Sequence, residues 1–364
     1  MAAVCFNRRT LKVPYHNKAD GFMAALVLAL NQVKFCEIHY CRPSIEWGPF
    51  PSCKYAGVRY PGRTPFFEKA RGPNAFEYYF RPLCENPPSQ LAAPKLTCEQ
   101  REQVHRVLPW AVRTYYYGRN DPQSSSPTNG SWAEFNEQWY RKQRTEGARL
   151  VSKYLRLQPS IEARLEQLSV SLLGRAGGPS RRPNGVTLPR SPTLGVHLRG
   201  TDKGKYIQTA GSGRQVLPSE YIPYVHAFLE AHPNGSVFVA TDSPSFLSEV
   251  QERWPQSRVR YQREVLRMET NIAFSAGKHS NYRKGEEVLL DMLLLSRCDF
   301  LLHAASGVAE FAIYFNPKLH HNSVHLQYTL GRQEPSWAPT IKLRAESKLR
   351  KRRKKRHRKQ SMDE

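Results

Sequence analysis

The stretch LGVHLRGTDKGKY, residues 194–206, joins a short apolar run to a cluster of charged side chains. Residues 194–198 are mostly apolar, which is typical of a buried strand, and Gly200 ends the run. The charges therefore gather at the strand's carboxyl end, where open α/β sheets bind ligands. Arg199 carries a planar guanidinium suited to bidentate contact with phosphate oxygens. A strand end with solvated charges is the alternative interpretation of this segment taken alone.

Around this stretch, the second half of the chain alternates strand and helix patterns, which favours an α/β fold with a doubly wound parallel sheet. The pattern predicts strands at 194–198, 236–241, 258–261 and 299–304, and helices near 219–231, 244–254, 286–298 and 307–316.

The first half is less regular. An almost wholly apolar helix is predicted over 22–35, with Asp20 as its cap and Gly21 in a tight turn. Residues 72–83 form an aromatic packing segment, and the helical pattern over 132–173 is interrupted at Pro159. The Gly- and Pro-rich stretch 174–185 reads as a linker, and we place the domain boundary there. The longest apolar run, 22–30, is shorter than the roughly 18 residues that a membrane span needs, so no transmembrane segment is expected.

Charge is concentrated at the carboxyl end. The chain has a net charge of +24, and residues 341–364 hold twelve of its 55 Lys and Arg but three of its 31 acidic residues. Such a run is a solvated tail, or a patch for nucleic acid or an anionic surface.

The cysteines and the N-glycosylation sequons give information on the cellular compartment of the protein. Seven cysteines include no CxxC pair, so a structural zinc site is not expected, and the odd number leaves at least one unpaired. One or two disulfides would form in an oxidising lumen. Sequons at Asn129 and Asn234 are compatible with that location.

Polar side chains follow three of the predicted strands, and parallel strands bring these ends to one crevice. The candidates are His197, Arg199, Asp202 and Lys203 after the first strand, Asp242 after the second, and Ser306 and Gly307 after the third. Ser306 precedes a helix that Pro317 ends, and a helix amino terminus is a natural oxyanion or phosphate site. Simple capping by Ser306 is the alternative.

Asp291 lies among leucines in EEVLLDMLLLSRC, where a carboxylate needs a partner. Guanine offers an N1–H and an N2 amine side by side, and one carboxylate can accept both. A salt bridge to Arg297 or another basic neighbour is the alternative.

Several common motifs are absent from the sequence. It has no Walker loop, GxGxxG, HExxH or GxSxG, and no Asp-x-Asp of the kind that holds a metal against a sugar nucleotide. Phosphate charge would then be neutralised by Arg199, Lys203 and backbone amides, without a metal.

Three motifs, in order, resemble the GDP-fucose fucosyltransferases, in the branch of the α-1,6-fucosyltransferases and the rhizobial chitin-oligosaccharide fucosyltransferase. GVHLRGTDK resembles HxRRTDK, VFVATDSPSFLSEV resembles ATDDPSLL, and the run ending in LLDMLLLSRCDFLLHAAS is similar to LDxxxLSxxDFLxxxxSS. The likeness covers 190–328 and, more weakly, 14–50.

The resemblance implies a two-domain GT-B-like glycosyltransferase. With the boundary at the linker, we expect 1–185 to form an acceptor-side α/β domain and 186–330 a Rossmann-like nucleotide-sugar domain. The composition of 331–364 predicts a basic disordered tail.

The resemblance also implies roles for single residues. Arg199 binds the β-phosphate, His197 and Asp291 bind guanine, and Ser306 and Gly307 bind a phosphate oxygen, while the loop at Asp20 and Gly21 faces the nucleotide. The sequence departs from the motifs at Gly200, Ser243 and Ile207, which replace the second Arg, the second Asp and the acidic base.

The resulting hypothesis is an inverting, metal-independent fucosyltransferase that uses GDP-fucose and a glycan or protein-linked acceptor. Arg199 and the amides after Ser306 stabilise the departing diphosphate, and Asp20 or Asp202 accepts the acceptor proton. One alternative is a protein that binds nucleic acid through its basic tail. The other is a catalytically inactive relative that binds GDP. A Golgi or secretory location would require an anchor preceding this chain, and the cytoplasm is the alternative.

Overall fold

The computed structural model describes nearly three fifths of the chain. The described residues are 10–14, 21–40, 42–48, 53–55, 58–60, 66–83, 137–174, 191–200, 215–268, 279–326 and 334–339.

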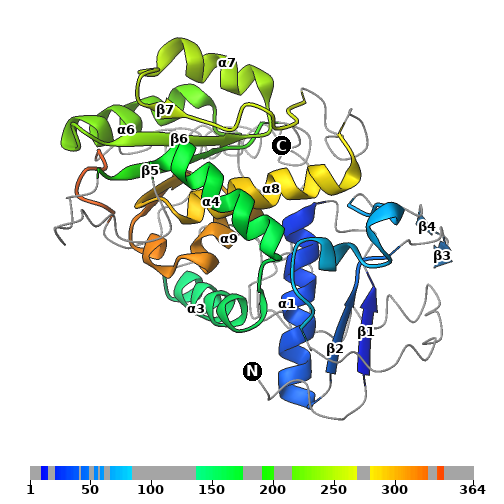
Figure 1. Cartoon of the computed structure of the whole chain (residues 1–364). Helices are drawn as coiled ribbons and strands as arrows, with labels where there is room; N and C mark the ends of the chain where they lie inside the picture. Colours follow the sequence, from blue (N-terminus) through cyan, green and yellow to red (C-terminus); the bar gives the residue numbers. More distant parts are fainter. Residues whose placement is uncertain are drawn as a thin grey trace, which may run out of the picture.

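A five-stranded parallel sheet organises the second half, in the order β7-β6-β5-β8-β9 (Figure 1). Its central strand is β5 (Thr193–Leu198), which is buried along its whole length. The other strands are β6 (Ser236–Thr241), β7 (Val259–Arg260), β8 (Phe300–His303) and β9 (Ser323–His325). The predicted parallel sheet is confirmed, and β9 is a strand that the sequence pattern did not reveal.

Helices cover both faces of this sheet. On one face, α6 (Pro218–Ala231) and α7 (Pro244–Arg253) share a core with the alternate side chains of β5 and β6. On the other face, α8 (Asn281–Ser296) and α9 (Gly307–Phe315) form the larger core. A Cβ at Gly195 would lie 3.0 Å from the Leu295 side chain, so glycine permits α8 to approach β5 closely.

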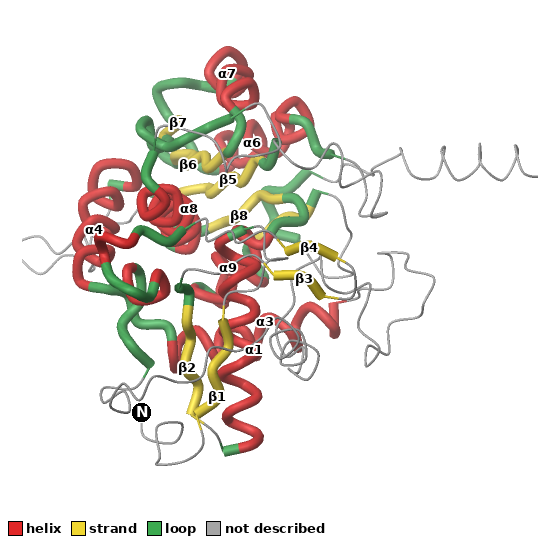
Figure 2. Tube along the Cα trace, turned by 90° about the vertical axis from the view of Figure 1, so that its right-hand side faces the viewer, coloured by secondary structure: helices red, strands yellow, loops and turns green. Residues whose placement is uncertain are grey.

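A smaller α/β unit is built from the amino-terminal residues (Figure 2). Strands β1 (Thr10–Pro14) and β2 (Arg42–Glu46) pair in parallel, and the long helix α1 (Phe22–His39) connects them. The strands β3 (Cys53–Tyr55) and β4 (Val58–Tyr60) pair antiparallel, and the 3-10 helices η2 (Lys69–Arg71) and η3 (Ala75–Tyr78) follow them. The predicted aromatic segment is confirmed by the burial of Phe76, Tyr79 and Phe80.

The expectation that Asp20 caps α1 is wrong. Gly21 occupies the N-cap position, with extended backbone angles (φ −144°, ψ 156°), and glycine has no side chain with which to cap the helix. Asp20 itself lies outside the described residues.

Two further helices from the first half cover the second half. The predicted break at Pro159 is confirmed, because α3 (Glu137–Tyr154) ends before it and α4 (Pro159–Leu173) begins with it. Helix α3 packs on α9, and α4 packs on α8 and β6. One continuous core therefore joins residues on both sides of the predicted boundary at 185, and that boundary stays a prediction.

Among the described residues, α1 has the length and composition to cross a membrane, but 61% of its apolar window is buried inside the protein. Its leucines pack in the main core, as those of an internal helix do.

The packed part of the chain extends beyond residue 330. Trp337 is buried, and its ring meets Phe228 and Phe300 edge-on, with centroids 5.4 and 5.7 Å away. The expected disordered tail therefore begins too early at 331, because residues 334–339 lie against the sheet domain. The Lys- and Arg-rich part of the tail falls outside the described residues.

Candidate active site

The carboxyl ends of three strands lie side by side, as the sequence predicted. His197 of β5 is paired with Ala240 of β6 on one side and with His303 of β8 on the other. The segments that follow these strands, at Arg199, Asp242 and Ser306, therefore leave the same edge of the sheet. This edge is the position at which α/β sheets hold ligands.

The ends of β5 and β6 are tied together directly. The backbone N–H of Gly200 donates to Oδ1 of Asp242 over 2.8 Å, and the Asp242 carbonyl accepts from the N–H of Met268 over 3.0 Å. Asp242 thus shapes the loop that carries Arg199. Arg199 is partly buried at the end of β5.

Two positions that depart from the fucosyltransferase motifs touch each other. A Cβ added at Gly200 would lie 2.5 Å from the Cβ of Ser243, which is closer than real Cβ atoms come. A larger side chain at position 200 would have to displace the loop after β6. Gly200 and Ser243, which replace the second Arg and the second Asp of the motifs, are therefore neighbours in space.

Ser306 caps helix α9. Its hydroxyl accepts from the N–H of Val308 over 3.2 Å, and its side chain is buried. The capping interpretation is thus observed, and the role of Ser306 and Gly307 toward phosphate stays a prediction. Because α9 begins directly after β8, its amino end lies next to the loop of Arg199.

A buried ion pair between α3 and α9 holds helix α9 in place. Arg144 of α3 donates from Nε and Nη2 to the two carboxylate oxygens of Glu310, at 2.9 and 2.7 Å, and also contacts His320. Burial alone would raise the pKa of Glu310, but Arg144 holds it below its usual value. A bidentate pair of this kind sets the orientation of α9 relative to α3.

Asp291 is buried in α8, with 8% of its surface exposed. Its Oδ1 accepts a hydrogen bond of 2.6 Å from the amide of Gln262. Burial raises the pKa of Asp291 to about 7, while the Gln262 hydrogen bond and the positive charge of Arg267 oppose the rise. The protonated and ionised forms of Asp291 are therefore both populated near neutral pH.

The alternative partner for Asp291 named from the sequence, Arg297, is wrong. Arg297 binds Glu166 and Ser169 of α4 instead, because it lies at the carboxyl end of α8, one and a half turns from Asp291.

Two residues near the edge were missed by the sequence analysis. Gln262 and Arg267 belong to the segment after β7, a strand of only two residues. His303 is fully buried, and its ring meets His325 of β9 edge-on, with centroids 4.7 Å apart. Since paired residues in a parallel sheet point to the same face, His197, His303 and His325 form a row beneath the edge. Among the described residues, no group of three or more His, Cys, Asp or Glu side chains fits a metal ion.

Side chains from the first half of the chain pack against helix α8, which carries Asp291. A Cβ at Gly285 would lie 2.3 Å from the Tyr79 hydroxyl and 3.1 Å from the Phe22 ring. Gly21, which precedes Phe22, therefore lies beside the helix that carries Asp291. The remaining predicted residues, Asp20, Asp202, Lys203 and Ile207, fall outside the described residues.

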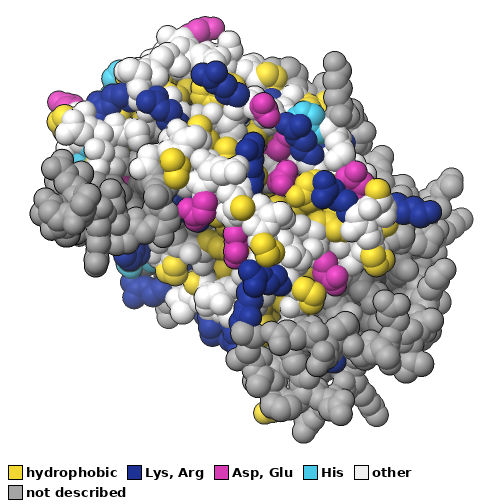
Figure 3. Space-filling view, viewed as in Figure 1, with side chains coloured by type: hydrophobic (Ala, Val, Ile, Leu, Met, Phe, Trp, Pro, Cys, Tyr) yellow, Lys and Arg dark blue, Asp and Glu magenta, His cyan; other side chains and the backbone are white. Residues whose placement is uncertain are grey.

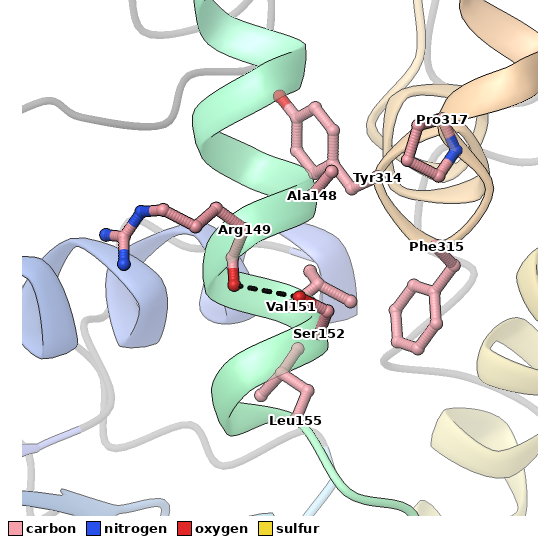
Figure 4. Close-up of a pocket in the computed structure, with 8 residues that line it drawn as sticks. All are labelled: Ala148, Arg149, Val151, Ser152, Leu155, Tyr314, Phe315 and Pro317. Carbon is pink, nitrogen blue, oxygen red and sulfur yellow. Dashed lines mark hydrogen bonds between the residues drawn. The ribbon is translucent and has the colours of Figure 1, made fainter. Parts of the chain in front are cut away.

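An open pocket of about 720 Å³ borders the site between α7, the segment after β7 and the start of α8. Its basic lining residues are Arg263, Arg267, His279 and Arg283. Lys and Arg side chains, with acidic ones among them, are spread over this face of the molecule (Figure 3). A second pocket, of about 330 Å³, lies where α3 meets the carboxyl end of α9, with Tyr314, Phe315 and Pro317 on one side (Figure 4). It is at the opposite end of α9 from Ser306 and takes no part in the site.

Comparison with known proteins identifies the class. Residues 183–311 match the family model of the N- and catalytic domains of alpha-(1,6)-fucosyltransferase. The chain is thus related to the GDP-fucose fucosyltransferases, which are glycosyltransferases. The matched residues include every predicted site residue from His197 to Gly307.

Solved structures with a similar outline belong to the same class. The NodZ alpha-1,6-fucosyltransferase co-crystallised with GDP matches with a TM-score of 0.40 and 16% identity, over 85% of this chain and 93% of that one. The apo form of POFUT1 matches with a TM-score of 0.43 and 10% identity, over 88% and 98%. At such low TM-scores the relationship rests on the family match.

Proposed function

We propose that this chain transfers fucose from GDP-fucose to a glycan or a protein-linked acceptor, with inversion at the anomeric carbon. The observation that carries the proposal is that Arg199 and the amino end of α9 follow the neighbouring parallel strands β5 and β8 at the same edge of the sheet. These groups belong to the segment that matches the fucosyltransferase family model.

The diphosphate would lie between these two groups. Neighbouring strands are about 4.8 Å apart, so a phosphate above the edge is within reach of both the Arg199 guanidinium and the first N–H groups of α9. Backbone N–H groups at a helix start and a nearby arginine are a common combination for phosphate. Lys203 would add a further positive charge.

The guanine base would be recognised by Asp291, with His197 beside it. An ionised Asp291 can accept from N1–H and N2–H of guanine, which adenine and uracil cannot both offer. Asp242, which the sequence analysis placed among the nucleotide-binding residues, would act by shaping the loop of Arg199 through its bond to Gly200.

The chemical step is a single displacement. The acceptor hydroxyl oxygen forms a bond to C1 of fucose while the bond from C1 to the β-phosphate oxygen breaks, and its electron pair leaves with GDP. The hydroxyl proton goes to a carboxylate, Asp20 or Asp202. Arg199 and the α9 amides stabilise the charge that develops on the phosphate. Because these groups come from the chain itself, activity should persist in the presence of a metal chelator.

The compartment follows from the cysteines. Cys36 of α1 is disulfide-bonded, whereas Cys298 is a buried free thiol. Disulfides persist in oxidising compartments, so a secretory lumen is the proposed location. The sequons at Asn129 and Asn234 support the same location.

The direct test is donor turnover by an Arg199 variant. Release of GDP from GDP-fucose is measured for the wild type, for Arg199→Ala and for Arg253→Ala, an exposed arginine on α7 that serves as the control. We expect Arg199→Ala to lose roughly two to three orders of magnitude in rate while the control is unchanged. Wild-type turnover by Arg199→Ala, or GDP binding without any turnover by the wild type, would contradict the proposal.

A further inference from the structure

The segment Gln262–Met268 forms a strap between two of the predicted site residues. At its beginning, the Gln262 amide donates to Asp291, and at its end the Met268 N–H donates to the Asp242 carbonyl. The strap thus joins α8 to the loop after β6. No sequence motif marks it.

Hydrogen bonds to charged side chains hold the strap. Arg267 donates from Nη2 to the Gln262 carbonyl over 2.6 Å, which closes the strap on itself. The N–H of Leu266 donates to Glu287 over 2.9 Å, and Glu287 is buried. Glu287 in turn contacts Arg283 at 2.9 Å and His279 at 2.8 Å. The backbone of Gln262 is therefore anchored, so its amide is presented to Asp291 at a set position.

We infer that Gln262 is a positioning residue for guanine recognition: its amide fixes the orientation of the Asp291 carboxylate. The inference rests on the proposed role of Asp291 toward guanine. With Oδ1 held by Gln262, the carboxylate plane cannot rotate freely, and it presents one edge to a ligand with two adjacent donors. A freely rotating carboxylate would lose part of that selectivity.

The charges around Asp291 make this hydrogen bond important. Burial raises the pKa of Asp291 to about 7, and Glu287 on α8 and Asp242 after β6 act in the same direction. The Gln262 amide and Arg267, both on the strap, lower it. A protonated Asp291 would turn one acceptor oxygen into a donor and so lose a bond to guanine. Guanine binding at neutral pH therefore depends on the strap.

The test compares nucleotide binding by the wild type, by two variants of Gln262 and by control variants. Gln262→Met keeps the length of the side chain and removes the amide, and Gln262→Glu places a second carboxyl beside Asp291. Gln256→Met is the matched control, because Gln256 bonds only to the carbonyls of Val250 and Trp254 at the end of α7. GDP, and inosine diphosphate, which lacks the N2 amine, are titrated calorimetrically between pH 6 and 9.

We expect the wild type to lose GDP affinity as the pH falls through about 7. Gln262→Met should bind GDP roughly tenfold more weakly at pH 7, with its midpoint moved to higher pH and a smaller preference for GDP over inosine diphosphate. Gln262→Glu should move the midpoint in the same direction, and Gln256→Met should match the wild type. Titration of Asp291→Asn isolates the pH dependence of the phosphates.

The outcomes distinguish a failure of the positioning role of Gln262 from a failure of the guanine assignment of Asp291. If Gln262→Met and Gln262→Glu both bind GDP with the wild-type affinity and midpoint, while Asp291→Ala has lost its preference for GDP, the positioning role is wrong and the guanine site stands. If Asp291→Ala keeps the preference for GDP, the guanine assignment fails and the inference fails with it.

Discussion

Gly200 and Ser243 explain how this chain departs from the motifs of its relatives. The fucosyltransferase motif has an arginine where Gly200 stands, but Ser243 leaves no room there, because even a Cβ would come within 2.5 Å of its own Cβ. The backbone N–H of Gly200 is used as well, in the bond to Asp242. Arg199 is therefore followed by glycine, and this strand end has no second arginine at the next position.

Replacement of Gly200 by alanine should destabilise the protein. The added methyl group must push the loop after β6 away, which we expect to cost about 1–3 kcal/mol in the free energy of unfolding. Urea denaturation measures this cost. The double variant Gly200→Ala/Ser243→Gly should recover most of it. Equal stability of the wild type and Gly200→Ala would show that this contact does not constrain the strand end.

Asp291 should make the stability of the ligand-free protein depend on pH. Its pKa is about 7 in the folded protein and near 3.8 when the group is unperturbed, so the folded state resists its ionisation. The favourable contribution is complete below pH 4 and is lost as the pH rises through 7.

The measurement is the unfolding free energy of the wild type and Asp291→Asn between pH 4 and 8. The neutral amide has no such ionisation, so the variant should gain about 2–4 kcal/mol relative to the wild type over this range. A difference that stays constant with pH would contradict a raised pKa at Asp291.

Among the elements, α9 bears most directly on the site, and the Arg144–Glu310 pair holds it against α3. Both side chains are nearly completely buried, at 3% and 4% exposure. Removal of one partner leaves a buried charge without its counterion.

We therefore expect Arg144→Met to lower the unfolding free energy by about 3–5 kcal/mol, whereas Arg144→Met/Glu310→Met should lie much closer to the wild type. Chemical denaturation measures both. Arg81→Met is the control, because its pair with Glu162 is half exposed and should change stability by about 1 kcal/mol or less. A loss in Arg144→Met no larger than in the control would contradict a structural role for the pair.

The elements of the second half were largely predictable from the sequence, and the exceptions have physical causes. Strands β5, β6 and β8 are apolar runs ended by polar residues, which is the pattern of buried parallel strands. Strand β9 has three residues with one apolar side chain between Ser323 and His325, too few for a pattern. Helix α8 begins earlier than its apolar pattern, because Ser280 caps a polar first turn by accepting from the N–H of Arg283.

The site was predictable to the extent that it follows from strand ends. The shared position of His197, Arg199, Asp242 and Ser306 was predictable because parallel strands bring their ends to one edge. Gln262 was not found, because its importance depends on a contact with Asp291, 29 residues further along the chain. Contacts made by a loop returning to a helix leave no periodic signal in the sequence.

At the scale of the whole molecule, α8 is the element that both halves share. The stacked rings of Tyr79 and Tyr282, with centroids 5.4 Å apart, join the first half to the start of this helix. Asp291 lies further along the same helix, facing the strap. The proposed donor site is therefore supported from the first half of the chain as well as from the sheet.

The basic tail follows the packed part of the chain in the sequence. Residues 345–364 follow the packed segment at Trp337 and carry most of the tail's positive charge. If the protein acts on a nucleotide sugar, this tail is not needed for GDP binding. If it acts on nucleic acid through the tail, removal of the tail abolishes its main activity.

The central claim is that the strand-end site recognises GDP. Calorimetric titration of the full chain with GDP, UDP and ADP tests it most directly, with Asp291→Ala and a chain lacking residues 345–364 titrated alongside. We expect GDP to bind most tightly, the preference to disappear in Asp291→Ala, and the shortened chain to bind GDP as the full chain does. Absence of nucleotide binding, or equal binding of the three nucleotides by the wild type, would contradict the account.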